Sequence, residues 1–544
     1  MSDKKIITGK ECIDNYEELT MEGRSRRGLL KSLGAASVIL AAASATSLTP
    51  FHVLAQTNHD ASPTIGKPGG KIKVASLSIS TADTLDPAKG SFSTDYTRHF
   101  MVYNGLTKFD EHLVPQLELA ERIDNENAQI WHIKLRKGVH FHDGKELIAD
   151  DVVFSISRHT DPATTSKIMG IAKQIQSVKA AGKYEVTITL EAPNAELPAI
   201  LADSHMLIVP ANVTNFNKGI GTGPFKLKSF KPGITTVVTK NENYWKPGLP
   251  YLDEIELFAI ADEPSRVNAL LSGEVHVISE VNPRSTARIK QSPHHQFINV
   301  PSGSYTDLIL RQDMAPGQSA DFTEAMKLLM DREQMKSSIF QGFATVGNDT
   351  PIAPGARYFN NELKQREFDP DKAKFLIKKA GFSNATIPLV TSNAPTGAVD
   401  IAVTMQQSAA KVGIKMEVQT KSTDGYWSNH WAKHPVSFGA VNARPSADII
   451  FSQFFLSSAA WNESHWKNTR FDSLLLDARK ETDETKRAQM YGEMQTLVHE
   501  LGGIGIPLFI SKIDGIDSRL KGYGTNPLGS FMGYMFAESV WLDA

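Results

Sequence analysis

The chain has 544 residues, of which 58 are Lys or Arg and 60 are Asp or Glu, so its formal charge at pH 7 is −2. This near-neutral balance gives no reason to expect nucleic acid or an anionic membrane surface as a partner. The length is sufficient for roughly two to four domains with large apolar cores.

The N-terminus has the pattern of an export signal. Two arginines, Arg26 and Arg27, precede an uncharged, Ala-rich run at residues 32–48, and an Ala-x-Ala-like site at Val53 and Ala55 follows. A charged segment, a moderately apolar segment and a small-residue cleavage site describe a cleavable signal, and the paired arginines indicate the twin-arginine type. We therefore expect residues 1–55 to be removed and the protein to act in the periplasm.

The alternative is that the same segment stays as a membrane anchor. The apolar run is short and rich in Ala, Ser and Thr, which suits poorly the roughly 30 Å of hydrocarbon that a spanning helix must cross. The single cysteine, Cys12, lies within this segment. The mature chain should therefore form no disulfide, thiolate metal site or cysteine nucleophile.

Strand and helix patterns alternate behind the signal. Alternating or short apolar runs predict strands at residues 71–75, 131–135, 186–190 and 235–239. Helical spacing predicts helices at residues 322–340, 371–380 and 471–501. The class is therefore mixed α/β, and we expect the chain to pass between lobes near residues 312–318 and 511–515.

One sequence block is the strongest motif of the chain. It comprises residues 131–144 (WHIKLRKGVHFHDG) and 147–155 (LIADDVVFS). It predicts a half-buried strand, a glycine-bracketed hairpin, and a helix whose first turn is capped by Asp150 or Asp151. The hairpin histidines, with Asp143 beside them, are a weak metal pattern, so we interpret the block as scaffold.

Further blocks follow in a fixed order. They are residues 221–227 (GTGPFKL), 241–245 (NENYW), 268–275 (NALLSGEV), 330–333 (MDRE), 368–373 (FDPDKA), 470–472 (RFD) and 506–507 (IP). The first lacks the Lys-Ser/Thr of a P-loop, so we interpret it as a structural turn. Together the blocks resemble the dipeptide/oligopeptide/nickel class (family 5) of extracytoplasmic solute-binding proteins, the receptors of ABC importers, over about residues 71–540.

The resemblance implies an α/β fold of the periplasmic-binding-protein type. Two lobes with mixed sheets are joined by a hinge, and the first lobe carries an extra subdomain. On this basis we expect the first lobe at residues 56–311 with an insert at about 106–220, the second lobe at 312–510, and a return to the first lobe at 511–544.

No catalytic motif competes with this interpretation. His499-Glu500 begins a zincin pattern, but Gly503 stands where the second histidine would be. We expect a binding protein with no enzymatic activity and no cofactor. Its partners would be a small polar solute, either peptide-like or an anionic conjugate, and an ABC permease of the inner membrane. We expect a monomer that binds no nucleic acid. The alternatives are a secreted hydrolase on an α/β scaffold and a chaperone-like envelope protein.

The family's peptide receptors hold the peptide ammonium with an aspartate in a Gly-Trp-x-x-Asp-like stretch. The corresponding residues here are 438–448 (FGAVNARPSAD), where Asn442 or Ala443 replaces the aspartate and Arg444 stands alongside. Arg444 offers a bidentate fork to a carboxylate or phosphate. Alternatively it forms an internal ion pair with Asp448 or another acid, and the sequence leaves both possibilities open.

Other binding candidates are polar or aromatic residues near the expected cleft. They are Phe92, Thr94 and Tyr96 in the first lobe, Ser302, Ser304 and Tyr305 near the first crossing, and Tyr426, Trp427 and Trp431 before the Arg444 stretch, with Asn442 and Asp448 in that stretch. Aromatic side chains give broad contact area at low entropic cost. Core packing explains each of them equally well.

We predict that replacing both Arg26 and Arg27 by Lys will hold the precursor in the cytoplasm, because the twin-arginine pathway requires that pair. Cell fractionation with immunodetection measures the distribution. Normal export of the double variant would contradict the twin-arginine assignment.

Overall fold

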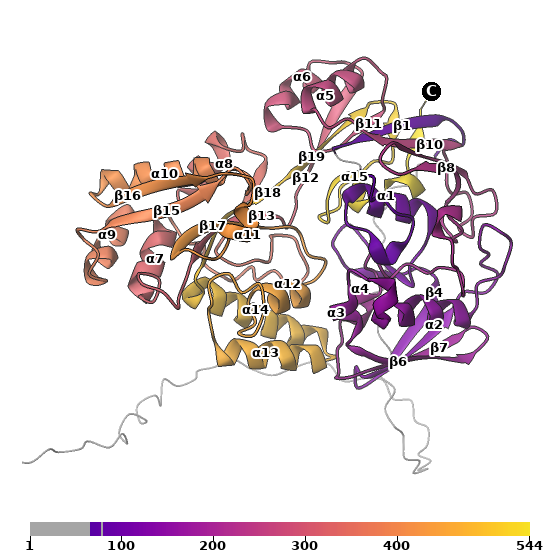
Figure 1. The fold of residues 1–544 in the computed structure, drawn as a ribbon, viewed down its shortest axis with the longest axis horizontal. Helices are drawn as coiled ribbons and strands as arrows, with labels where there is room; N and C mark the ends of the chain where they lie inside the picture. Colours follow the sequence, from indigo (N-terminus) through magenta and orange to yellow (C-terminus); the bar gives the residue numbers. More distant parts are fainter. Residues whose placement is uncertain (1–65, 78–79, 544) are drawn as a thin grey trace, which may run out of the picture. The chain divides into compact units, whose positions relative to one another are not determined.

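The structure, a computed structural model, describes residues 66–77 and 80–543 (Figure 1). The predicted signal residues Arg26, Arg27 and Ala55 lie outside the described residues. Helices and strands alternate along the chain, which confirms the mixed α/β class. Within the described ranges, no helix is both long enough and apolar enough to cross a bilayer.

Two sheets build the first lobe. The larger sheet has the order β12 (His295–Val300), β19 (Lys512–Asp517), β11 (Val277–Ile278), β1 (Lys71–Ser76), β10 (Glu254–Ala259), β9 (Thr235–Lys240) and β8 (Phe225–Lys231). The smaller sheet has the order β4 (Ala120–Glu126), β5 (Ile130–Leu135), β7 (Glu185–Leu190) and β6 (Ile175–Gly182). Two short pairs join β2 (Thr107–Phe109) to β3 (Pro115–Leu117) and β20 (Leu520–Lys521) to β21 (Trp541–Leu542). The helices of this lobe are α1 (Ser93–Val102), α2 (Ala149–Ser157), α3 (Met169–Ala172), α4 (Leu197–Ile200), α5 (Glu263–Leu271), α6 (Thr286–Lys290) and α15 (Ser530–Gly533).

The two sheets of the first lobe have separate apolar cores. In the larger sheet, Ile72 and Val74 of β1 are buried in one cluster with Val102 of α1. In the smaller sheet, Trp131 of β5 is buried in a second cluster with Ile156 of α2. The strongest sequence motif is therefore scaffold, and the smaller sheet falls within residues 106–220, the range proposed for the inserted subdomain.

The second lobe is one sheet with helices on both faces. Its strand order is β14 (Ala344–Val346), β18 (Ile504–Ile510), β13 (Tyr305–Leu310), β17 (Val436–Val441), β15 (Thr386–Ser392) and β16 (Lys415–Lys421). Its helices are α7 (Ala320–Leu328), α8 (Arg332–Ser338), α9 (Pro370–Lys379), α10 (Ala398–Lys411), α11 (Tyr426–Asn429), α12 (Ala447–Phe454), α13 (Thr469–Lys480) and α14 (Glu484–Leu501). In β13, Leu308 and Leu310 pack against α7 to α10, whereas Tyr305 and Ile309 pack against α12 to α14. Successive side chains of a strand point to opposite faces, so β13 is buried on both sides.

The chain passes between the lobes at two adjacent places. The first crossing is residues 301–304, between β12 and β13, and the second is Ser511, between β18 and β19. The Ile510 N–H donates to the Ser304 carbonyl oxygen at 2.7 Å, so the crossings lie side by side. The first crossing precedes the expected segment 312–318, because β13 already pairs with β17 and β18 of the second lobe.

Two predicted helices are each divided into two. The predicted helix 322–340 is interrupted between α7 and α8, where the Asp331 side chain accepts an N–H bond from the first turn of α8. The predicted helix 471–501 is interrupted between α13 and α14, where Asp483 caps α14 in the same way. An N-capping aspartate satisfies the free N–H groups of a new helix, so it favours a break even where the apolar spacing continues.

The turn at residues 221–224 is structural, as predicted. The Gly223 N–H donates to the Val102 carbonyl oxygen at 2.9 Å. A Cβ atom at position 221 would lie 2.1 Å from that oxygen, and one at position 223 would lie 2.4 Å from the Val102 carbonyl carbon. The His142 ring reaches the carbonyl oxygens of Gly219 and Gly223 at 3.3 and 3.0 Å, which fastens the hairpin to this turn.

We expect Gly223→Ala to reduce the free energy of unfolding by about 1–3 kcal/mol or more, because the added methyl group must displace backbone atoms. Gly170→Ala is the matched control, since nothing lies within 4 Å of a Cβ at that position. Urea denaturation of both variants measures the effect. Equal stability of the two would show that the turn at 221–224 tolerates a side chain.

Candidate functional site

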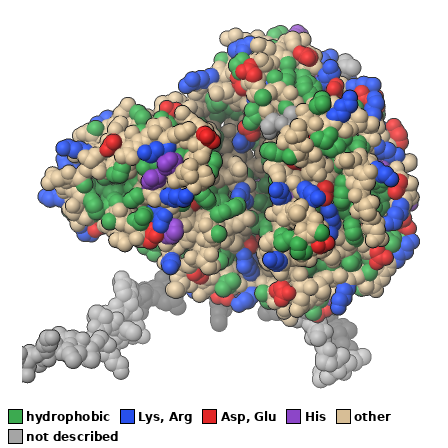
Figure 2. All heavy atoms as spheres, viewed as in Figure 1, with side chains coloured by type: hydrophobic (Ala, Val, Ile, Leu, Met, Phe, Trp, Pro, Cys, Tyr) green, Lys and Arg blue, Asp and Glu red, His purple; other side chains and the backbone are tan. Residues whose placement is uncertain are grey.

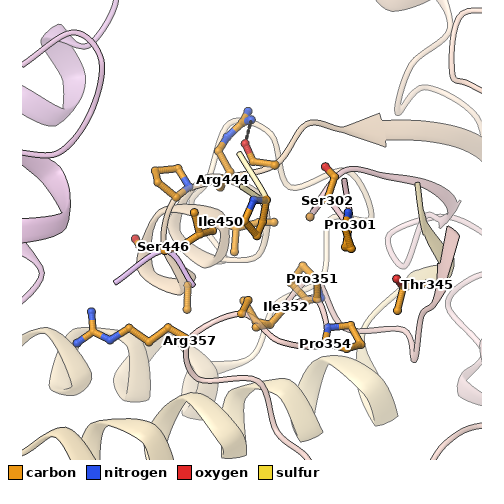
Figure 3. Close-up of a pocket in the computed structure, with 18 residues that line it drawn as sticks. Pro301, Ser302, Thr345, Pro351, Ile352, Pro354, Arg357, Arg444, Ser446 and Ile450 are labelled. Atoms are coloured by element: carbon orange, nitrogen blue, oxygen red, sulfur yellow. Dashed lines mark hydrogen bonds between the residues drawn. The ribbon is translucent and has the colours of Figure 1, made fainter. Parts of the chain in front are cut away.

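A pocket opens beside the first crossing (Figure 3). It contains about 670 Å³ of atom-free space, part of which is open to solvent. The crossing residues 301–303, the segment 351–357 and the loop 443–447 form most of its walls, and Leu113 and Pro527 of the first lobe complete it. Both lobes therefore line the pocket, and a site between domains is a common place for a small ligand.

Arg444 lies in the loop between β17 and α12. Its Nε donates to Gln453 Oε1 at 2.8 Å, and one Nη donates to the Asn442 carbonyl oxygen at 3.0 Å. The guanidinium carbon lies 5.4 Å from the centroid of the Phe454 ring. These contacts fix the direction of the guanidinium, which Figure 3 shows at the edge of the pocket, pointing away from Ile352.

The expected alternative of an ion pair between Arg444 and Asp448 is wrong. Asp448 instead accepts from Arg479 at 2.7 Å, which joins α12 to α13. Among the described residues, no carboxylate oxygen lies within 4.0 Å of the Arg444 nitrogens. Burial lowers the pKa of Arg444, so its positive charge is partly desolvated, and Asp203 of the first lobe opposes this shift from beyond ion-pair distance. A partner anion from solution would relieve that cost.

The first-lobe candidates lie at the start of α1. Tyr96 is half-buried, and burial raises the pKa of its hydroxyl to about 12, while the positive charge of Arg444 opposes that rise. Tyr96 and Arg444 are therefore within electrostatic reach across the lobes. Phe92 is 37% exposed, whereas Thr94 is fully buried, and its hydroxyl has no hydrogen-bond partner among the described residues.

The second-lobe aromatic candidates divide between core and surface. Tyr305 is buried against Phe509, and the buried Tyr426 donates its hydroxyl to a backbone carbonyl at 2.7 Å. Trp427 is 44% exposed, and its ring contacts Tyr426 and Trp431, not the pocket. The structure therefore does not bring Tyr426 or Trp427 into the pocket lining.

Ser304 organises the backbone around Arg444. Its Oγ accepts from the Ala443 N–H at 3.0 Å and from the Ser302 hydroxyl at 3.1 Å. Asn442 is exposed, and its carbonyl oxygen holds the Arg444 guanidinium. The structure thus links Ser304, Asn442 and Arg444 through hydrogen bonds of the loop 442–444, and of these three residues only Arg444 lines the pocket.

Several pocket residues carried no signal in the sequence analysis. Leu113, Ile352 and Pro527 line the pocket as ordinary apolar side chains. Pro351 and Pro354 also line the pocket, and two prolines so close in sequence indicate a restrained backbone. Beside Arg444, Phe454 contacts the half-exposed Trp461, with ring centroids 5.5 Å apart.

Asp307 and Glu463 form a buried pair of acids in the second lobe. Asp307 of β13 is fully buried and Glu463 is 4% exposed, and the Trp431 indole N–H donates to Glu463. Burial raises the pKa of Asp307 to about 7, and burial with the neighbouring Asp307 raises the pKa of Glu463 well above its usual range. The pair therefore retains a proton at neutral pH.

The fold and pocket define a two-lobed binding protein. The family profile described as bacterial extracellular solute-binding proteins, family 5 (middle), matches residues 114–463. The chain belongs to that family, as its sequence blocks indicated.

Relatives and solved structures agree with this assignment. The glutathione-binding protein GsiB of Escherichia coli O6:K15:H31 is 27% identical over 466 residues, covering 82% of this chain and 90% of the relative. DppA of Helicobacter pylori, solved with the peptide STSA, is 24% identical and superposes with a TM-score of 0.72 over 88% of this chain and 99% of its own. AgaA of A. tumefaciens R10, solved with agropinic acid, is 22% identical, with a TM-score of 0.70 over 87% and 99% of the two chains. These solved structures confirm the periplasmic-binding-protein fold.

We predict that the double variant Asp307→Asn/Glu463→Gln will flatten the pH dependence of stability. The ordinary pKa values of the two carboxyls, 3.8 and 4.5, are raised in the folded protein. The stability that they contribute is therefore full below about pH 4 and is lost as the pH rises through the folded values. Between pH 5 and pH 8, the free energy of unfolding of the variant should rise relative to that of the wild type by on the order of 2 kcal/mol.

Thermal or urea denaturation across that pH range measures the difference. The control is Asp150→Asn/Glu185→Gln, which alters one exposed Asp and one exposed Glu. Parallel pH profiles for wild type and the Asp307/Glu463 variant would contradict proton retention by the pair.

Proposed function

We propose that this protein captures a small solute with an anionic group, either peptide-like or a conjugate, between its lobes and delivers it to an ABC permease. The observation that carries the proposal is Arg444, a fixed guanidinium at the interlobe pocket with no carboxylate within 4.0 Å among the described residues. A solute carboxylate or phosphate would accept the remaining N–H donors of this fork. Phe92, Tyr96, Ser304 and Asn442 are the residues that we propose beside it.

The missing aspartate supports the same solute class. In the peptide receptors of the family an aspartate holds the ammonium, whereas the aligned loop here has Asn442, Ala443 and Arg444. The pattern disfavours an ordinary peptide N-terminus at this position, because a buried ammonium without a counter-charge is costly. Glutathione and agropinic acid, which the names of two related proteins mention, both carry carboxylates.

The composition of the pocket favours binding over hydrolysis. Within the described residues, its lining has Ser, Thr and Arg as polar side chains and no His, Cys, Lys, Asp or Glu. A hydrolase needs a general base or a carboxylate pair beside the substrate. The Asp307 and Glu463 pair is buried and is not part of the lining. We further propose export by the twin-arginine pathway, action in the periplasm, and a monomeric state.

A thermal-shift panel tests the solute class. Ligand-free protein is mixed with glutathione, agropinic acid and tri- and tetrapeptides, each paired with its ester or amide derivative. A solute at a hundredfold excess over Kd stabilises the fold by about 2.7 kcal/mol, so the free acids should raise Tm and the neutral derivatives should not. Equal shifts from both members of each pair, or none from any acid, would refute the proposal.

We expect Arg444→Ala to weaken binding of such an acid by about 2–4 kcal/mol, because a charge-assisted bond is lost and the anion is left unpaired. Unliganded Tm should change little, since the guanidinium makes no ion pair within the described residues. Isothermal titration and thermal melting measure the two effects.

Asp448→Asn is the matched comparison. It removes the charge that binds Arg479, so it should lower Tm without a comparable loss of affinity. Normal binding combined with lost stability in Arg444→Ala would assign that arginine a structural role.

A further inference from the structure

One acid of the first lobe is buried against the second lobe. Glu196, directly before α4, is 2% exposed. Its carboxylate lies 3.4 Å from Arg357 Nη1, 3.4 Å from Arg487 Nε and 3.3 Å from the Tyr358 hydroxyl, all groups of the second lobe. A carboxylate buried against three donors is costly to separate from them, because each group would have to be resolvated or left unpaired.

A backbone bond accompanies this contact. The Ala195 N–H donates to the Arg479 carbonyl oxygen at 2.7 Å, which joins the loop before α4 to the end of α13. The loop is itself held to the first lobe, because the Asn194 N–H donates to the Ala128 carbonyl oxygen at 2.8 Å. The contact therefore links structured parts of both lobes.

The second lobe presents a positively charged site to Glu196. Arg357 and Arg487 both bind Glu484, so two guanidinium groups face a single carboxylate of their own lobe. The Arg357 guanidinium also stacks on Tyr358, 4.5 Å from the ring centroid. Glu196 supplies the second negative charge, and burial of Glu196 and Arg487, with Arg357 half-buried, strengthens their attraction.

Neither crossing takes part in this contact. The lobes are joined covalently at residues 301–304 and Ser511, whereas α4 and α13 lie away from β12 and β19 in Figure 1. A non-covalent bond at a second place biases the relative orientation of two bodies that share a hinge.

We propose that Glu196 is a positioning residue for solute binding, which favours the arrangement in which the lobes meet and so raises the fraction of unliganded protein that is competent to bind. Apparent affinity scales with that fraction. Glu196 does not itself line the pocket and reaches it only through Arg357. The proposal rests on solute binding between the lobes and not on the identity of the solute.

The test measures the separation of the lobes in unliganded protein. Cys12 is the only cysteine, so Cys12→Ser leaves two introduced cysteines as the only thiols. Lys179→Cys in β6 and Lys411→Cys at the end of α10 place spin labels on exposed positions of the two lobes. Pulsed electron–electron double resonance then gives the distribution of distances between the two labels. Glu196→Gln should shift that distribution from the wild-type distances to longer and broader ones.

Glu484→Gln is the matched control, because it removes a carboxylate from the same two arginines within one lobe. It should leave the distribution unchanged, and Glu196→Asp should restore part of the wild-type distribution. An unchanged distribution in Glu196→Gln, or equal shifts in Glu196→Gln and Glu484→Gln, would overturn the proposal.

A second readout uses glutathione as the probe. Glu196→Gln should weaken its binding by about tenfold through the smaller competent fraction, with the circular dichroism spectrum of the fold retained. Absence of glutathione binding to the wild type would count against that solute only, since the distance measurement needs no ligand.

Discussion

The arrangement of the molecule depends on the double passage of the chain between its lobes. Both crossings are short, and the hydrogen bond from Ile510 to Ser304 keeps them side by side. Two adjacent connections allow the lobes to rotate about one region but not to separate. The same Ser304 accepts from Ala443 through its hydroxyl, so the loop that carries Arg444 is anchored at the pivot. The candidate binding group is thereby held close to both crossings.

Charge compensation distinguishes Arg444 from several other arginines of the protein. Arg479 has Asp448, Arg357 has Glu484 and Glu196, and the buried Arg98 has Asp83 and Asp95. These pairs use their charges to join helices, loops and lobes. Arg444 is held instead by neutral acceptors, a side-chain amide and a backbone carbonyl, which orient a guanidinium without neutralising it. Such an arrangement suits a group whose counter-charge arrives with a solute.

The sequence predicted the scaffold well where local chemistry decides structure. The strand at 131–135, the helix that begins after Asp369 and the glycine turn at 221–224 formed as expected, because capping, alternation and steric limits act over a few residues. The helix 471–501 was predicted as one element because its apolar spacing continues through a break that Asp483 caps. The first crossing was placed too late, because pairing of β13 with β17 is a contact between distant segments.

Fewer residues of the candidate site than of the scaffold could be predicted from the sequence. Arg444 and Ser304 could be selected from a departure from the family pattern and from their place near a crossing. Tyr426 was selected for its aromatic ring, yet burial decided its role, and Asp448 was selected for its spacing, yet Arg479 on another helix took the pair. Leu113 and Glu196 could not be found, because their importance arises only when two lobes are brought together in space.

The aromatic pair beside Arg444 has an optical consequence. The Phe454 ring contacts both the guanidinium and the Trp461 indole, and Trp461 is 46% exposed to water. The emission wavelength of an indole depends on the polarity of its surroundings, so displacement of water near this ring changes its fluorescence. Trp461 is therefore an intrinsic fluorophore connected to Arg444 through Phe454. A change of its emission on binding of a solute at Arg444 can be recorded without a label.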